Sequence, residues 1–202
     1  MTSFLHRLAA AMLAAFLAAA APALAQTEVV NAPDPYIHRG TGLAFPERPE
    51  GFLRAAITEH EGKAGDLSVD YWTDGTTPML IGILLMKGDG GSCADWFAAM
   101  SSATMLEKGV VRNADAETFV LLPDALFEQF SASYTLPART MDANHPELAK
   151  PQLTACPITK GKRGPTWVVQ YSATLLASDG PRAEALARQL FAAIDWTPIT
   201  GT

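Results

Sequence analysis

Thr166-Trp-Val-Val-Gln-Tyr-Ser-Ala-Thr-Leu-Leu-Ala177 is the stretch that decides the fold, because apolar and polar residues alternate along it. One side of the pattern holds Trp167, Val169, Tyr171, Ala173 and Leu175, and the other holds Gln170, Ser172 and Thr174. A period of two, built from Trp, Val, Tyr and Thr, predicts a β-strand with one buried face.

A helix is expected directly after this strand. Apolar residues recur at helical spacing, at Ala183, Leu186, Ala187, Leu190 and Ile194. We expect Ser178 or Asp179 to cap the helix and Pro181 to lie in its first turn, where the missing N–H would have no partner in any case. A strand that leads into a helix packed back on the same sheet predicts the core of the protein.

The N-terminus has the pattern of a secretory signal peptide. A short segment with one basic residue, Arg7, precedes Leu8 to Ala21, which contains only Ala, Leu, Met and Phe. Pro22 and the small-residue pattern Ala23-Leu24-Ala25 then predict cleavage after Ala25. A membrane anchor is the alternative, because residues 8–25 approach spanning length. Cleavage predicts a periplasmic or secreted protein with no stable membrane insertion.

The charge balance limits the classes of partner. The net charge is −6, and removal of residues 1–25 takes away Arg7 and makes it −7. An acidic chain is poorly suited to nucleic acid or to anionic membrane surfaces. One basic cluster, Lys160, Lys162 and Arg163, lies among glycines and is interpreted as a solvated turn.

The rest of the mature chain predicts an irregular arm over residues 26–50 and a single domain over residues 51–202. A short strand is expected in the arm at Leu43–Phe45. The domain is expected to begin with strands at 51–60, 67–72 and 79–86, the last a continuous apolar run covered on both faces. A helix from Cys93 to about Lys108 should follow, with Ser92 and Asp95 as a capping box, Gly109 at its end, and Trp96, Met100 and Ala103 on one face.

Further strands are predicted at 117–122 and 128–136, although Ala125–Phe130 is also compatible with the start of a helix. Residues 137–163 hold four prolines and are interpreted as a long loop. The result is an α+β fold with a single, mainly antiparallel sheet of about six strands and two principal helices. The third strand, the first helix and the fourth strand are expected to form a right-handed crossover.

The two cysteines, Cys93 and Cys156, give two hypotheses. In an exported protein a disulfide bond is the default, and closing so long a segment stabilises the fold by roughly 4–5 kcal/mol. Alternatively, Cys93 is a nucleophile activated at a helix N-terminus, within Gly91-Ser-Cys-Ala-Asp-Trp96. Such a site needs a base, and the mature histidines, His38, His60 and His145, lie in no recognisable signature.

No other motif predicts a catalytic residue, a metal or a cofactor. The glycines of Lys87-Gly-Asp-Gly-Gly-Ser92 predict a tight turn, because the phosphate-loop pattern is absent and Asp89 would repel a phosphate. Glu59-His60-Glu61 on a strand points its carboxylates away from the imidazole. Asp142, Asn144, His145 and Glu147 are interrupted by Pro146 and fit no metal-binding loop.

Several segments together resemble small exported bacterial proteins with a PsbP-like fold: Phe45-Pro46, Gly51-Phe-Leu-Arg54, Ser68-Val-Asp-Tyr71, Trp167-Val-Val-Gln-Tyr171 and Ala192-Ala-Ile-Asp-Trp196. The resemblance covers residues 45–196. It implies an antiparallel sheet flanked by helices and a role as an accessory or assembly partner. We therefore expect a non-catalytic exported protein that binds an envelope protein or a small ligand. The alternatives are a small cysteine hydrolase using Cys93 and a structural envelope protein.

Overall fold

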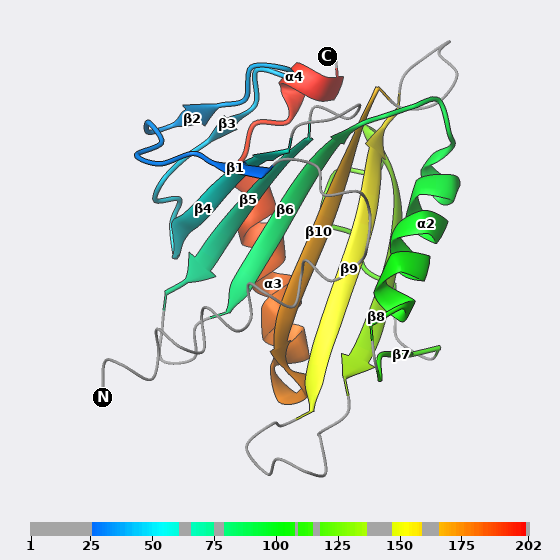
Figure 1. Cartoon of the computed structure of the whole chain (residues 1–202). Helices are drawn as coiled ribbons and strands as arrows, with labels where there is room; N and C mark the ends of the chain where they lie inside the picture. Colours follow the sequence, from blue (N-terminus) through cyan, green and yellow to red (C-terminus); the bar gives the residue numbers. More distant parts are fainter. Residues whose placement is uncertain are drawn as a thin grey trace.

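The computed structural model describes residues 26–60, 66–74, 79–107, 109–114, 118–136, 147–158 and 166–200. The predicted signal peptide and the cluster Lys160, Lys162 and Arg163 lie outside these residues. The main feature is one eight-stranded sheet in which every neighbouring pair of strands is antiparallel (Figure 1). In spatial order its strands are β1 (Gln26–Glu28), β4 (Phe52–His60), β5 (Asp66–Thr73), β6 (Leu80–Lys87), β10 (Trp167–Leu176), β9 (Leu148–Pro157), β8 (Phe127–Leu136) and β7 (Val111–Arg112).

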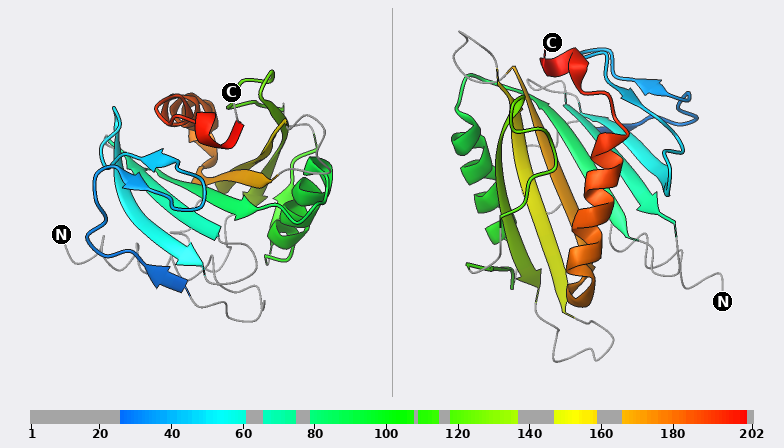
Figure 2. Two further views of the ribbon diagram at one scale, coloured as in Figure 1. Left: turned by 90° about the horizontal axis from the view of Figure 1, so that it is seen from above. Right: turned by 180° about the vertical axis from the view of Figure 1, so that it is seen from behind.

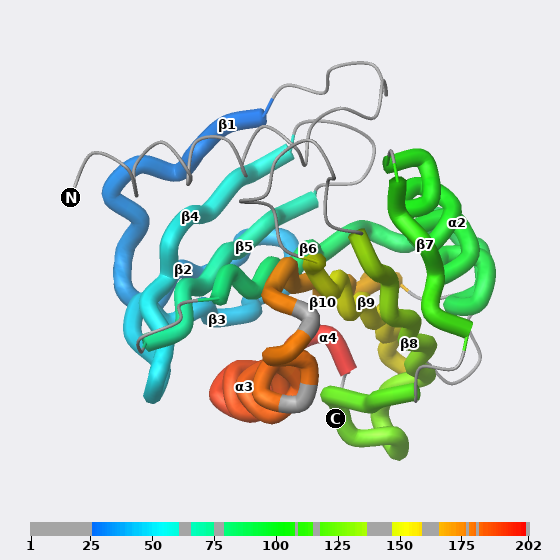
Figure 3. The backbone as a smooth tube through the Cα atoms, turned by 90° about the horizontal axis from the view of Figure 1, so that it is seen from below, coloured from blue at the N-terminus to red at the C-terminus, as the bar shows by residue number. Residues whose placement is uncertain are grey.

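Two helices of 13 residues lie on opposite sides of this sheet (Figures 2 and 3). The helix α3 (Gly180–Ala192) covers what we call the α3 face, and α2 (Cys93–Met105) lies over β8 and β9 on the α2 face. A hairpin of β2 (Tyr36–Ile37) and β3 (Ala44–Phe45) and a short α4 (Thr197–Thr200) complete the described elements. The predicted α+β class is therefore confirmed, with eight strands in the main sheet rather than six.

The α3 face carries the main hydrophobic core. Alternate residues of β5, β6, β9 and β10 point into it: Leu67, Val69, Tyr71, Ile81, Ile83, Leu85, Leu153, Ala155, Val169, Tyr171, Ala173 and Leu175. The predicted helical stripe meets them through Ala183, Ala187, Leu190 and Ile194, while Leu186 is only partly buried. Phe191, which was not part of the prediction, is buried in the core as well. The period-two and period-3.6 patterns near the C-terminus thus predicted both elements and their buried sides correctly.

The helix termini confirm one cap and correct two others. Ser92 and Asp95 form the predicted capping box of α2. Asp179 makes no capping hydrogen bond with its side chain, because a 3-10 turn (Ala177–Asp179) precedes α3. The helix α2 ends at Met105, so Gly109, which does have a positive φ of 84°, is not its terminating residue. Ala103 is exposed, and the buried residues of α2 are Cys93, Ser101 and Thr104.

The strand β9 was missed, because the prolines of residues 137–163 predicted a loop. Pro151 lies inside β9 opposite Ser133 of β8. On its other side the ladder to β10 has pairs at Gln152 and Ala149 but none at Pro151, the residue that has no N–H to donate. A central strand therefore tolerates this proline at the cost of an interruption in one ladder.

The strand predicted at 117–122 was wrong over its described residues. The N–H of Phe119 donates to Ser131 Oγ at 2.8 Å, and those of Leu121 and Leu122 donate to Gln129 Oε1 at 3.1 and 3.0 Å. Side chains of β8 thus take the hydrogen bonds that a neighbouring strand would have taken. The predicted crossover was wrong as well, because the described residues 118–122, which were to form its fourth strand, are not a strand.

The segment over residues 26–50 is more regular than the predicted arm. It contains β1, β2 and β3, and Leu43 and Phe45 are completely buried in the main core. Arg54 of β4 holds the segment by donating to the carbonyl oxygens of Phe45 and Pro33. Tyr71 Oη donates to the Pro46 carbonyl at 3.0 Å. These contacts fix the segment around the β4 side of the sheet (Figure 3).

Replacing Gln129 with Ala should release residues 119–122 from β8. The variant loses the Oε1 acceptor and also the donation from Nε2 to the Leu122 carbonyl at 2.7 Å. We expect the free energy of unfolding to fall by about 2 kcal/mol and the Leu121 and Leu122 amides to exchange faster with deuterium. Glu128→Ala, at the exposed neighbouring position, is the control. Unchanged amide protection in Gln129→Ala would contradict this role.

Candidate functional site

The two cysteines lie where α2 meets the sheet. Cys93, the first residue of α2, and Cys156 of β9 have their sulfur atoms 2.12 Å apart, which is a disulfide bond. Val168 and Met86 are buried around it, and Trp96, Met100 and Phe130 pack against the cluster. A sulfur atom in this bond has no thiolate form, so it cannot attack a substrate.

The rest of α2 docks on the sheet largely through polar groups. Gln152 Nε2 donates to Thr104 Oγ1 at 2.7 Å. Lys150, whose side chain is only 6% exposed, forms an ion pair with Glu107 at 2.6 Å just beyond the end of the helix. The disulfide and this pair hold the two ends of α2 against the sheet, and a space beside β8 lies next to it.

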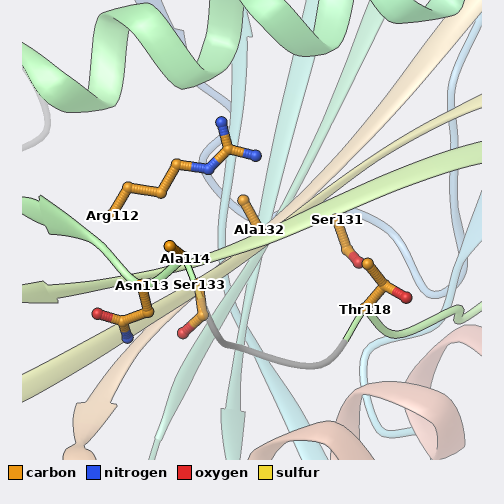
Figure 4. Close-up of a pocket in the computed structure, with 7 residues that line it drawn as sticks. All are labelled: Arg112, Asn113, Ala114, Thr118, Ser131, Ala132 and Ser133. Carbon is orange, nitrogen blue, oxygen red and sulfur yellow. The ribbon is translucent and has the colours of Figure 1, made fainter.

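That space is a pocket of about 320 Å³ at the β7 end of the sheet (Figure 4). It is lined by Arg112, Asn113, Ala114, Thr118, Ser131, Ala132 and Ser133. Figure 4 shows Arg112 and Asn113 on one side and Ser131 with Thr118 on the other. The pocket walls therefore present a guanidinium group, an amide and three hydroxyl groups.

The pocket exists because β7 pairs with only a short part of β8. Val111 and Arg112 oppose Thr135 and Tyr134, and the Asn113 N–H donates to the Ser133 carbonyl at 2.9 Å. The chain then leaves the edge. Since alternate residues of a strand direct their N–H and C=O groups to the same side, Ser131 also presents its backbone groups to this edge. Among the described residues no strand pairs with this stretch of the β8 edge, which forms part of the pocket.

Arg112 is the charged group of the pocket. Its guanidinium carbon lies 5.8 Å from the centre of the Phe97 ring, which stacks in turn on Phe130 at 5.7 Å. Within the described part of the chain no carboxylate forms an ion pair with it. An arginine held against an aromatic ring, with its hydrogen-bond donors open, is suited to a carboxylate or phosphate.

The other residues considered from sequence do not assemble into a site. His38 bonds Thr41 Oγ1 and lies edge-on to Trp167, while His60 Nε2 bonds Ser68 Oγ at 2.7 Å. Neither histidine contacts Cys93. Asp142, Asn144 and His145 lie outside the described residues. Across the residues that are described, no cluster of three His, Cys, Asp or Glu side chains is arranged to bind a metal.

The glycine-rich loop before α2 behaves as the predicted tight turn. Gly90 has a positive φ of 99°, and Asp89 Oδ1 accepts from the Gly91 N–H at 3.2 Å. The Ser92 N–H donates to Asp95 at 2.9 Å. The donors that would bind a phosphate are therefore engaged by carboxylates of the loop and helix.

Comparison with known proteins adds no relative: no family model, no curated protein and no solved structure matches the chain. Among the described helices, none combines the length and the apolar character needed to span a bilayer.

Removing the disulfide should destabilise the protein strongly. The bond links residues 63 positions apart, for which the loop-entropy relation gives about 4 kcal/mol. We expect a Cys93→Ala, Cys156→Ala double variant to show a loss of this size in urea unfolding monitored by circular dichroism. The reducing agent dithiothreitol should weaken the wild type similarly and leave the variant unchanged. A free thiol titrated in the native, unreduced protein would contradict the bond.

Proposed function

We propose that this protein is a non-catalytic, exported binding protein, and that the Arg112 pocket receives a ligand through its carboxylate group. The N-terminal signal-peptide pattern and the disulfide bond support export. The observation that carries the binding role is Arg112, which has no ion-pair partner among the described residues and lies beside hydroxyl groups and the edge of β8.

The geometry favours the free C-terminus of an extended peptide over other carboxylates. The backbone of such a peptide can pair with the edge of β8 at Ser131, while its terminal carboxylate meets Arg112. Ser133 and Thr118 add hydroxyl donors at the same place. An accessory role of this kind agrees with the expected PsbP-like class, and the disulfide at Cys93 disfavours the hydrolase alternative.

Two matched peptides test the proposal. The mature protein, labelled with nitrogen-15, is titrated with acetyl-triglycine as the free acid or as the C-terminal amide. We expect saturable amide shifts at Asn113 and Ser131–Ser133 with the acid only. Arg112→Gln should weaken the binding about tenfold, because a charge-assisted hydrogen bond is lost.

Arg48→Gln is the control, because it makes the same change of charge at an exposed position away from the pocket; its side chain is 72% exposed. Binding should be retained in this variant. Equal shifts with the acid and the amide, or equal affinities in Arg112→Gln and wild type, would rule out a carboxylate site at Arg112.

A further inference from the structure

None of the described helices lies over the part of the α2 face formed by β4, β5 and β6 (Figure 1). The helix α2 contacts β8 and β9, and its apolar cluster reaches no further than Leu84, Met86 and Val168. Beyond that cluster this face presents polar side chains, such as Asp70 and Ser172, together with the apolar Trp72 and Leu80. The predicted cover on both faces of β6 is thus only partial within the described part of the chain.

Asp70 lies in the middle of this face. Its neighbours on β5, Val69 and Tyr71, point into the main core, so Asp70 points to the opposite side. The register places Asp70 next to Gly82 of β6, and Gly82 next to Ser172 of β10. A carboxylate, a glycine and a hydroxyl group therefore form one row across three strands.

Gly82 leaves a notch between the two polar side chains. A Cβ atom at this position would lie 3.1 Å from Asp70 Oδ1 and 3.5 Å from Ser172 Oγ. Both oxygen atoms thus border the same small space, which even an alanine methyl group would fill. Glycine keeps that space open and keeps the carboxylate accessible from it.

The carboxylate of Asp70 has no partner within the described residues. No ion pair or hydrogen bond involves it, although the side chain is half-buried. Burial alone raises its pKa to about 6. The fold removes water from this carboxylate, and no described residue pairs with it. The ionised group therefore lowers the stability of the fold, as expected of a group kept for binding.

The residues around Asp70 indicate which charge and shape a ligand at this position should have. A carboxylate is best satisfied by a cationic donor, and Ser172 adds an acceptor beside it. Trp72, two residues along β5, shares the face with Asp70, and its neighbour across the ladder is Leu80. An aromatic ring next to a carboxylate suits an ammonium group on an alkyl chain.

We propose that Asp70, Ser172 and the notch at Gly82 form a binding site for an alkylammonium group, independent of the Arg112 pocket. The ammonium group lies over Gly82 and donates to Asp70 and Ser172, while its alkyl chain extends along Trp72 and Leu80.

The first test measures how much the ionised carboxylate of Asp70 destabilises the fold. Since the folded pKa of Asp70 lies above its usual value, ionisation destabilises the fold above pH 6, and this effect disappears below the usual value near 3.8. We expect Asp70→Asn to melt about 5 °C higher than wild type at pH 8 and at the same temperature at pH 3.5. Asp66 and His60, the titratable groups on this face of β5 and β4, are present in both proteins; β6 and β10 present none there. Equal melting at pH 8 would overturn the proposal.

The second test measures binding. We expect n-butylammonium to produce saturable nitrogen-15 amide shifts at Gly82 and Ser172, and n-butanol to produce none. Asp70→Asn should bind n-butylammonium at least about tenfold more weakly. Gly82→Ala should also lose binding, because it keeps the carboxylate but fills the notch. Asp66→Asn, the same change four residues along the same strand face, should bind as wild type does.

Equal shifts with n-butanol, or unchanged affinity in Asp70→Asn, would overturn the site. A further titration with acetyl-Gly-Lys-Gly-amide identifies the source of the group. Tighter binding than n-butylammonium assigns the site to a lysine side chain of a protein, and binding of n-butylammonium alone assigns it to a small amine. Both results support the site itself.

Discussion

The sheet depends on the insertion of β10 between β6 and β9. Eight consecutive pairs, from Trp167 opposite Lys87 to Thr174 opposite Leu80, join β10 to β6, and a second ladder joins it to β9. Without β10 the sheet would separate into β1-β4-β5-β6 and β9-β8-β7. β10 therefore pairs with strands that lie far from it in the sequence. Ordering the long intervening segments costs conformational entropy, and the burial of residues such as Tyr171 offsets this cost.

Local periodicity explains which elements could be predicted. β5 and most of β6 alternate between buried and partly buried residues, and α3 buries Ala183, Ala187 and Leu190 at helical spacing. β9 was hidden because Pro151 and Pro157 suggested a loop, and only the surrounding strands show that a proline is tolerated there. Residues 119–122 form a short apolar run of the kind found in strands, yet Gln129 and Ser131 take their hydrogen bonds. Whether side chains of β8 or a neighbouring strand take these hydrogen bonds depends on the tertiary structure, so the local sequence does not predict it.

The two proposed binding sites could not be predicted from the sequence, for a geometric reason. Arg112 and Ser131 are 19 positions apart and meet because β7 ends early on β8. Asp70, Gly82 and Ser172 come from three strands and share a row only through the register. In the sequence each is one polar or small residue in an alternating pattern. The cysteine pair was easier to propose, because two cysteines allow a single intramolecular pairing.

Very short strands lie at both margins of the sheet. β1 has three residues and β7 has two, so neither offers a long row of free backbone groups. A second copy of the chain therefore finds little template on which to extend the sheet, which limits fibre growth through strand pairing. For the same reason, a peptide that binds at the edge of β8 can pair only with the few residues next to Ser131. A peptide bound there makes only a few backbone hydrogen bonds, so its side chains and its terminus must determine most of the binding selectivity.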